Sequence, residues 1–406
     1  MKFKAIWKYL DYIIFFCFLF FCSIGLYISF IGTEKILLAV YGYFLFRVFY
    51  YLIVKKKQIL ISKGLTILVT YAVFSSLFSD FIFFSLRSSI MNLVIPTLIV
   101  YYMVTRYEQK LLILNIFLVG ITITILSLFF ICFIPNYGIS EFGEWKGVFI
   151  HKNPLGFSML FYSLMSIFFL FVFKKLSIRL LLTFISFIQI ILLLNSESTT
   201  NILLFVLGIS MYILIIILKN IKNIFLKVSF LAIFLSLLIP IIISTFKNLS
   251  QVFVVIGKDY TFTGRTIIWE SIANMLNNHW LLGFGYDSFW VEGSVTKNYL
   301  DSIMKTNVPH AHNNYLDIIA NFGVVGLLIS LGCFVSYFYM NIRLVKQTNK
   351  LVDYFPIVLL SLLLIHAIYE SYFIRPNSVS SVWCIYIIFY LGIKIKLNKL
   401  RAKRNK

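Results

Sequence analysis

The chain has 406 residues, of which 61% are hydrophobic and only 13% are charged. A soluble domain is about half apolar and a quarter charged, so this composition excludes an ordinary soluble protein. The formal net charge of +21 is of the size found in nucleic-acid-binding proteins, but its meaning depends on where the charge lies. Apolar runs long enough to cross a membrane recur along the chain and predict an all-α integral membrane protein.

About twelve transmembrane helices are predicted. In chain order they cover residues 10–31, 36–54, 64–84, 88–104, 111–134, 154–173, 178–195, 201–218, 224–245, 318–340, 354–373 and 378–393. The first run is too long for a signal peptide and no small-residue cleavage site follows it, so we interpret it as an uncleaved helix. Residues 1–406 are therefore expected to form one polytopic membrane domain.

The charged residues are divided unequally between the two sides that these spans define. An even number of spans puts both termini on one side, which carries 25 Lys and Arg and only three acidic residues. The other side carries ten basic and twelve acidic residues, and Arg47 lies within a span. The positive-inside rule therefore predicts cytoplasmic termini. The basic tail is expected to contact membrane lipids, and no nucleic-acid partner is predicted.

The only long loop, residues 246–317, falls between the ninth and tenth spans on the extracytoplasmic side. Long ordered loops are usually functional. Within it, residues 263–276 are expected to form an amphipathic helix capped by Thr263, with Arg265 in the first turn. A cation there opposes the helix dipole, which indicates either a bound anion or an Arg side chain that reaches lipid headgroups.

The histidines lie on the outer side of the predicted topology. His151, His279, His310 and His312 fall in outer loops, and His366 lies in the outer half of its span. Any chemistry is therefore expected at the outer face. Two imidazoles without a partnered Cys or a third His are a weak zinc signal, so no metal is predicted for the pair at 310 and 312. The alternatives are a general base and a His that hydrogen-bonds at a helix start.

Two glycine pairs indicate close packing. Gly283 and Gly285 predict a turn or a close backbone approach in the long loop. Gly323 and Gly326 lie in the tenth span, where they are expected to let neighbouring helices approach closely.

Several of these motifs together resemble the O-antigen ligase and polysaccharide polymerase family, the WaaL/Wzy group. His312-Asn313, followed by nine residues and then Gly323-Val-Val-Gly326, resembles the family signature. The segments Phe262-Thr-Gly-Arg-Thr-Ile-Ile-Trp and Leu281-Leu-Gly-Phe-Gly-Tyr-Asp-Ser-Phe-Trp resemble its ExoQ-like exopolysaccharide polymerase branch. His151-Lys-Asn-Pro-Leu-Gly resembles a third family element.

The resemblance implies a GT-C-type glycosyltransferase, without metal or cofactor, at the outer face of the bacterial cytoplasmic membrane. Its donor and acceptor would be undecaprenyl-diphosphate-linked oligosaccharides, with chain-length regulator and flippase proteins as further partners. Carried over by motif, Arg265 would hold the diphosphate and His312 would assist transfer. One departure is the segment Asn195-Ser-Glu-Ser, because many members have a Ser-Arg pair there.

Other outer-face residues are expected to bind the diphosphate or the sugars. Arg87, Lys152 or Arg375 would supply the cation that the absent Ser-Arg arginine supplies elsewhere. The motifs add His151, Asn153 and Asn313 to the expected substrate-binding residues.

The predicted function is a polymerase that transfers a growing chain from undecaprenyl diphosphate to a new lipid-linked repeat unit. One alternative is a ligase that moves the finished glycan to lipid A core or to a protein. Another is a transporter of lipid-linked glycans, which would bury ionisable residues at the midplane, where this sequence has only Arg47. The ExoQ-like motifs favour the polymerase over the ligase.

Overall fold

The structure is a computed structural model that describes residues 2–24, 33–221, 223, 225–226, 264–348 and 351–371. In this part of the chain all regular structure is helical, and an isolated β-bridge joins Ile139 to Trp145. Eight of the described helices are long and apolar enough to cross a membrane, and two shorter apolar helices cover residues 63–78 and 355–366. The chain is therefore an all-α, multi-pass integral membrane protein. The predicted ninth span except residues 225–226, the predicted twelfth span and the Thr263 cap lie outside the described residues.

The first half of the bundle begins with two long helices and a helical hairpin. Its elements are α1 (Lys2–Ile24), α2 (Thr33–Phe49), η3 (Tyr50–Val54), α3 (Lys63–Ser75), η4 (Ser76–Phe78), α4 (Ile82–Ser89), η5 (Ile90–Val94), α5 (Ile95–Arg106) and α6 (Gln109–Phe133). The predicted span 64–84 is wrong at its end, because the helix stops at Phe78. Ser79 is extended there, and its Oγ accepts the backbone N–H of Phe81 at 2.9 Å, a local bond that competes with helix formation.

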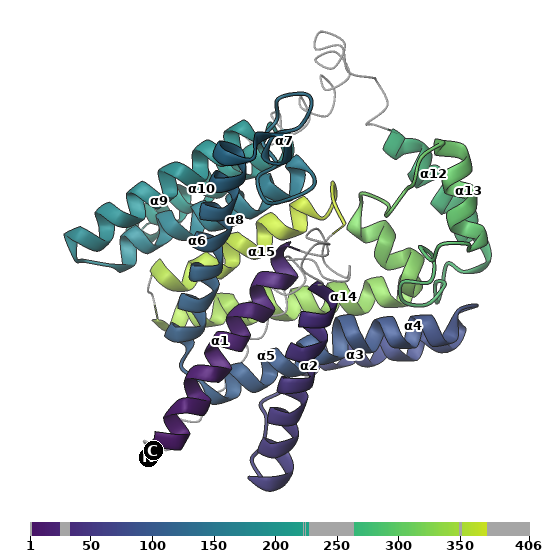
Figure 1. The fold of residues 1–406 in the computed structure, drawn as a ribbon, viewed down its shortest axis with the longest axis horizontal. Helices are drawn as coiled ribbons and strands as arrows, with labels where there is room; N and C mark the ends of the chain where they lie inside the picture. Colours follow the sequence, from purple (N-terminus) through teal and green to yellow (C-terminus); the bar gives the residue numbers. More distant parts are fainter. Residues whose placement is uncertain are drawn as a thin grey trace.

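A second group of helices packs around α8 (Lys152–Val172). It contains α7 (Pro135–Gly138), α9 (Leu176–Asn195) and α10 (Thr199–Asn220), which lie together with α6 in Figure 1. The apolar part of α8 is 72% buried, more than that of any other candidate span among the described residues. Helix α8 consequently packs against α6, α9 and α10.

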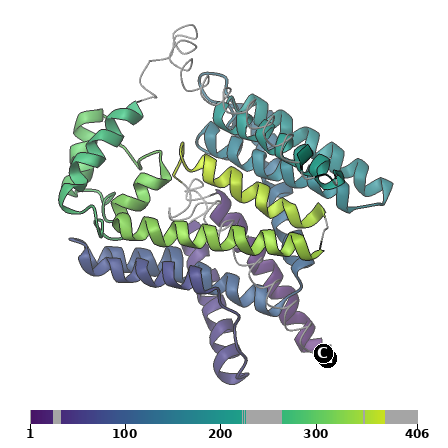
Figure 2. The ribbon, with the colours of Figure 1, turned by 180° about the vertical axis from the view of Figure 1, so that it is seen from behind.

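The remaining elements are α12 (Arg265–Met275), η7 (Leu276–Asn278), α13 (Val295–Met304), α14 (Asn314–Thr348), η8 (Leu351–Tyr354) and α15 (Phe355–His366). Figures 1 and 2 show α12 and α13 together at one side of the molecule, beside the first turns of α14. They enclose a small core of their own that includes Ile272, Phe289 and Leu300, each 0% exposed. The described part of the long loop is thus folded onto the helical bundle.

A buried ion pair ties α1 to α2. Arg47 donates from Nε and Nη2 to the two carboxylate oxygens of Asp11, each at 2.9 Å, and Asp11 is 0% exposed. The hydroxyls of Tyr43, Tyr102 and Tyr107 also donate to this carboxylate. The deep arginine of the second span is therefore paired, and its partner is fully hydrogen-bonded.

A kink in α14 receives the glycine-rich part of the long loop. Gly323 has φ 64° and ψ −171°, and four backbone hydrogen bonds of 2.8–3.2 Å join residues 280–285 to residues 320–325. A Cβ on Gly323 would lie 2.1 Å from a carbonyl oxygen of that loop. The close approach is confirmed, but at Gly323 the partner is the loop rather than a neighbouring helix. At Gly326 the close neighbours include Tyr71 of α3, as expected for helix packing.

Candidate functional site

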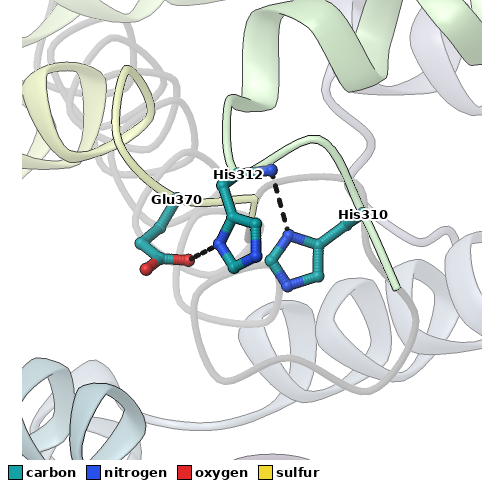
Figure 3. Close-up of side chains that lie close together, drawn as sticks. All are labelled: His310, His312 and Glu370. Carbon is teal, nitrogen blue, oxygen red and sulfur yellow. Dashed lines mark hydrogen bonds and ion pairs between the residues drawn. The ribbon is translucent and has the colours of Figure 1, made fainter. Parts of the chain in front are cut away.

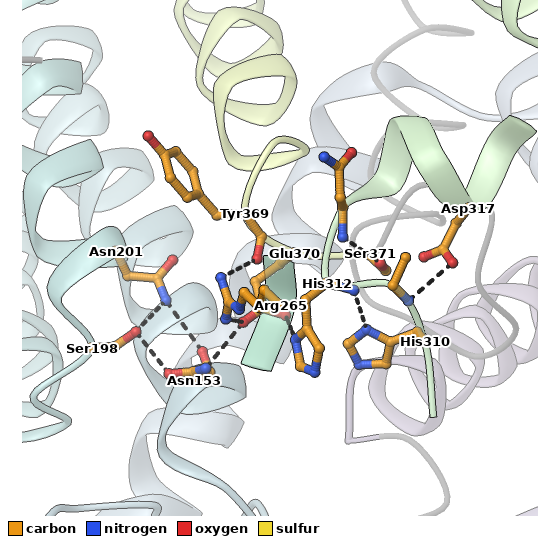
Figure 4. A network of polar contacts seen from close by, with 12 residues as sticks. Asn153, Ser198, Asn201, Arg265, His310, His312, Asp317, Tyr369, Glu370 and Ser371 are labelled. Atoms are coloured by element: carbon orange, nitrogen blue, oxygen red, sulfur yellow. Dashed lines mark hydrogen bonds and ion pairs between the residues drawn. The ribbon is translucent and has the colours of Figure 1, made fainter. Parts of the chain in front are cut away.

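Glu370 lies at the centre of a polar network just beyond the end of α15. Its Oε1 accepts hydrogen bonds from Nη2 of Arg265 and from Nδ2 of Asn153, both at 3.1 Å, and its Oε2 lies 3.2 Å from Nδ1 of His312. Only 6% of Glu370 is exposed. Figure 4 shows this carboxylate between α8, α12 and the loop that precedes α14. One buried acid therefore joins three residues that the sequence placed in the site.

Three hydrogen bonds hold the turn after α15 in place. They position Arg265 and the loop between α13 and α14 (residues 305–313, the histidine loop) relative to Glu370. The three hydrogen bonds run from Arg265 Nη1 to Tyr369 O (2.8 Å), from Asn313 N to Ser371 Oγ (3.1 Å) and from Asn314 N to Ala367 O (2.8 Å).

Helix α12 carries Arg265 and is docked on the histidine loop. One helical turn after Arg265, Nε1 of Trp269 donates to the carbonyl of Ala311 at 2.8 Å. The backbone N–H of Ala311 in turn donates to Oδ1 of Asp317 at 3.2 Å. Arg265 and Trp269 thus lie one turn apart on α12, Arg265 in contact with the turn after α15 and Trp269 in contact with the loop before α14.

His312 has a constrained backbone. Its φ is 50°, a conformation that a residue with a Cβ adopts at a cost of about 1–2 kcal/mol. Its N–H donates to Nδ1 of His310 at 3.1 Å, and the two rings lie 4.0 Å apart by their centroids (Figure 3). The next residue, Asn313, accepts the N–H groups of Tyr315 and Leu316 and so caps α14. The predicted role of Asn313 in substrate binding thus competes with a capping role.

These hydrogen bonds assign the proton on each imidazole. An ionised carboxylate only accepts, so Nδ1 of His312 donates to Glu370, and in the neutral imidazole Nε2 carries the lone pair. His310 has the opposite tautomer, because its Nδ1 accepts a backbone N–H and its proton therefore sits on Nε2. Burial alone would raise the pKa of Glu370, but the hydrogen bond from His312 and the charges of His312 and Arg265 outweigh it and lower that pKa. Glu370 is therefore ionised at neutral pH.

His310, His312 and Glu370 are also close enough to be compared with a metal site. One ligand atom from each lies within 4.8 Å of the others. A zinc ion at about 2.0–2.2 Å from its ligands would take either Nδ1 or Nε2 of His310. Nδ1 already accepts the N–H of His312, and a metal on Nε2 would require a proton on that same Nδ1. Metal binding would break this hydrogen bond, so we do not assign a metal site, and metal-free chemistry stays a prediction.

Four helices begin around the network. They are α8 at Lys152, α10 at Thr199, α12 at Arg265 and α14 at Asn314. The first three have no side-chain hydrogen bond to their N-terminal N–H groups. Each helix N-terminus carries the equivalent of about half a positive charge. Together with Arg265, these N-termini make the surroundings of the network favourable for an anion such as phosphate.

The remaining predicted residues lie outside this network. His151 is exposed at the start of α8, and Lys152 pairs with Glu144 at 2.6 Å. Arg87 is exposed on α4, and Arg375 lies outside the described residues. None of these cations that the structure describes is brought beside Arg265. The expectation that one of them supplies a second diphosphate contact therefore stays a prediction.

Glu370 was not among the residues predicted from the sequence, and it falls within the predicted span 354–373. A signal was present, because a carboxylate in an apolar run is costly unless it is paired and for that reason marks a functional site. Ser198 and Asn201, which contact Asn153, gave no such signal. Short polar residues at a helix start are ordinary capping residues.

Residues 184–331 match a protein-family model described as O-antigen ligase. The chain is 24% identical over 151 residues, 36% of its length, to the exopolysaccharide production protein ExoQ of Rhizobium meliloti (strain 1021). It is 29% identical over 160 residues, 38% of its length, to a Rickettsia felis protein named "Putative polysaccharide ligase". A similarly named protein of Rickettsia prowazekii is 29% identical over 174 residues, 41% of this chain. The chain covers only 33–42% of the length of these relatives. The family match includes Arg265 and His312 but neither Asn153 nor Glu370.

Proposed function

We propose that the chain is a member of the O-antigen ligase family, whose model matches residues 184–331, and that it is a polysaccharide polymerase. It transfers a growing glycan from undecaprenyl diphosphate to a new lipid-linked repeat unit. The reaction takes place at the outer face of the bacterial cytoplasmic membrane, with both termini cytoplasmic. The enzyme is a GT-C-type glycosyltransferase that uses no metal.

The observation that carries this proposal is the carboxylate shared by Arg265 and His312. Glycosyl transfer from a lipid diphosphate needs a fixed cation for the departing anion and a base for the acceptor hydroxyl. Glu370 contacts both groups at 3.1 and 3.2 Å, so it holds a cation and a base side by side in a mostly buried place.

The neutral tautomer of His312 that the contact with Glu370 favours is the one that a base requires. Glu370 fixes the proton of His312 on Nδ1, which leaves Nε2 to accept a proton, as the acid does in a Ser-His-Asp triad. The acceptor hydroxyl oxygen forms a bond to the anomeric carbon of the donor glycan. The bond from that carbon to the diphosphate oxygen breaks, and its electron pair leaves with the lipid diphosphate. Nε2 of His312 takes the hydroxyl proton.

Arg265 retains a donor for the diphosphate. Its Nη1 and Nη2 are used within the network, whereas Nε is buried without a hydrogen-bond partner among the described residues. An unsatisfied buried donor costs about 1–3 kcal/mol. A phosphate oxygen would satisfy it, and the uncapped N-termini of α8, α10 and α12 favour the same charge.

The proposal is tested by reconstituting the purified protein in liposomes with synthetic undecaprenyl-diphosphate repeat units. We expect the wild type to produce a ladder of polymers and His312→Ala and Arg265→Ala to produce none. His279→Ala is the control, because His279 lies in the same loop, stacks on Phe284 and takes no part in the network. Folded His312→Ala and Arg265→Ala proteins that make wild-type polymer would refute the assignment.

The ligase activity is a second candidate, favoured by the names of the two Rickettsia relatives. A deletion strain separates the two activities. Loss of a polymerase leaves single repeat units on the final acceptor, whereas loss of a ligase leaves full-length chains on undecaprenyl diphosphate. The second pattern would overturn our choice.

A further inference from the structure

We propose that Asn153 is a positioning residue that, together with Ser198 and Asn201, holds the carboxylate of Glu370 in register with His312. This inference rests on the proposed function, in which Glu370 serves His312. The sequence motif suggested substrate binding for Asn153, but the contacts of its side chain lead into the protein.

The amide of Asn153 is engaged on both sides. Its Nδ2 donates to Oε1 of Glu370, and its Oδ1 accepts the hydroxyl of Ser198, both at 3.1 Å (Figure 4). Because a hydroxyl donor faces Oδ1, the amide nitrogen is directed toward the carboxylate. The hydrogen bond from Ser198 therefore decides that Glu370 meets a donor and not a carbonyl oxygen.

Asn201 supports the other two residues from the first turn of α10. Its Nδ2 donates to Oγ of Ser198 at 2.8 Å and to the backbone carbonyl of Asn153 at 3.3 Å. A donor at Oγ leaves the Ser198 hydroxyl proton for Asn153. Ser198 is 4% exposed and Asn201 is 1% exposed, so water does not compete with these bonds.

A glycine allows the two helix starts to meet. A Cβ on Gly156 of α8 would lie 2.8 Å from Cβ of Ser198 and 2.9 Å from Oγ of Ser196. The turn between α9 and α10 consequently presses against the first turn of α8. The sequence departs in this turn from the Ser-Arg pair that many members of the resembling family have. In this chain the same turn supplies Ser198, which acts on the carboxylate through Asn153.

The charges around Glu370 make Asn153 a sensitive position. Arg265 faces the carboxylate from α12, His312 from the loop before α14, and His366 from the end of α15. The group that faces the carboxylate from α8 is the neutral amide of Asn153. An aspartate at this position has nearly the same shape but puts a negative charge against Glu370, which favours the protonated form of Glu370. Protonated Glu370 has lost the negative charge that holds the proton of His312 on Nδ1, and only its carbonyl oxygen can still accept.

The test compares Asn153→Asp with Asn195→Asp. Asn195 is the matched control, because it lies at the same α9–α10 turn and its Nδ2 bonds only locally, to the carbonyl of Ile191. The measurement is kcat/KM for polymer formation in proteoliposomes as a function of pH. For Asn153→Asp we expect the acid limb of the profile to move up by about one pH unit or more. Activity should recover at higher pH, where Glu370 is again ionised. The Asn195→Asp profile should superimpose on the wild type.

Ser198→Ala is the second variant, because it frees the amide of Asn153 to rotate without adding a charge. It should lower kcat/KM with a smaller movement of the acid limb. Folding is checked by the elution volume and the midpoint of thermal unfolding in detergent. A uniform loss of activity at every pH in Asn153→Asp would show a merely structural role and overturn the inference. Its failure is separable from that of the proposed function, since His312→Ala would still abolish polymerisation.

Discussion

Glu370→Gln removes the charge at the centre of the network and keeps its shape. Glutamine has one acceptor oxygen, whereas Oε1 now accepts from Arg265 and Asn153 and Oε2 accepts from His312. One side of the network must therefore meet an NH2 group. A hydrogen bond to a charged group contributes about 1.5–3 kcal/mol, which corresponds to a rate factor of about 10–150.

The proton position on His312 adds to this loss. Without an ionised acceptor at Nδ1, the imidazole is free to carry its proton on Nε2, where it cannot act as a base. The equivalent change in a Ser-His-Asp triad lowers kcat about 10⁴-fold. We therefore expect Glu370→Gln to lower kcat between about 10²- and 10⁴-fold.

The assay is polymer formation from lipid-linked repeats in proteoliposomes, measured under single-turnover conditions. Glu270→Gln is the matched control, because Glu270 is exposed on the same helix as Arg265. It should behave as the wild type. If the kcat of Glu370→Gln lies within about threefold of the wild-type value, the loss is smaller than one such hydrogen bond contributes, and the reasoning is refuted.

Three further predictions concern stability, each measured by unfolding in detergent. Asp11→Ala leaves Arg47 buried without its carboxylate and should lower the free energy of unfolding by about 3–5 kcal/mol; an unchanged value would contradict the buried pair. Gly323→Ala places a Cβ 2.1 Å from a carbonyl oxygen at a residue with φ 64°, and it should lower the free energy of unfolding by about 2 kcal/mol or more. Gly332 lies in the same helix and a Cβ there would have no neighbour within 4 Å, so Gly332→Ala should not destabilise the protein. The stability that ionised Glu370 contributes is present above the ordinary carboxyl pKa of 4.5 and is lost as the pH falls through its lowered pKa. The stability gap between wild type and Glu370→Gln should therefore narrow below pH 4.5, and a gap independent of pH would count against the ion pairs.

Much of the helical architecture could be predicted because an apolar run of spanning length has few alternatives in a membrane. The end of the third span could not, since Phe78 and Phe81 continue the apolar run on either side of Ser79 and Asp80, and a side-chain hydrogen bond decides the break. Gly323 shows the same difficulty. A glycine in an apolar run is compatible with helix packing and with a kink, and the loop at residues 280–285 makes the difference.

The site was predictable where a motif carries its own chemistry and hidden where chemistry depends on a distant partner. Arg265 and His312 were found because their neighbours in the sequence resemble family motifs. Glu370 lies 58 residues from His312 and 105 from Arg265 along the chain, so only the tertiary structure brings them together. Lys152 was predicted to be available for the diphosphate because nothing in the sequence indicates its ion pair with Glu144.

The location of Glu370 at the end of α15 imposes an order on biosynthesis. A chain is made from its N-terminus, so Asn153, Arg265 and His312 all leave the ribosome before the carboxylate that joins them. Until α15 has been inserted, the guanidinium of Arg265 lacks its counter-ion and the N–H groups of residues 313 and 314 lack the acceptors that hold the histidine loop. His312, the proposed base, consequently gains its carboxylate partner only after the last described helix has entered the membrane, and under our proposal incomplete chains are inactive.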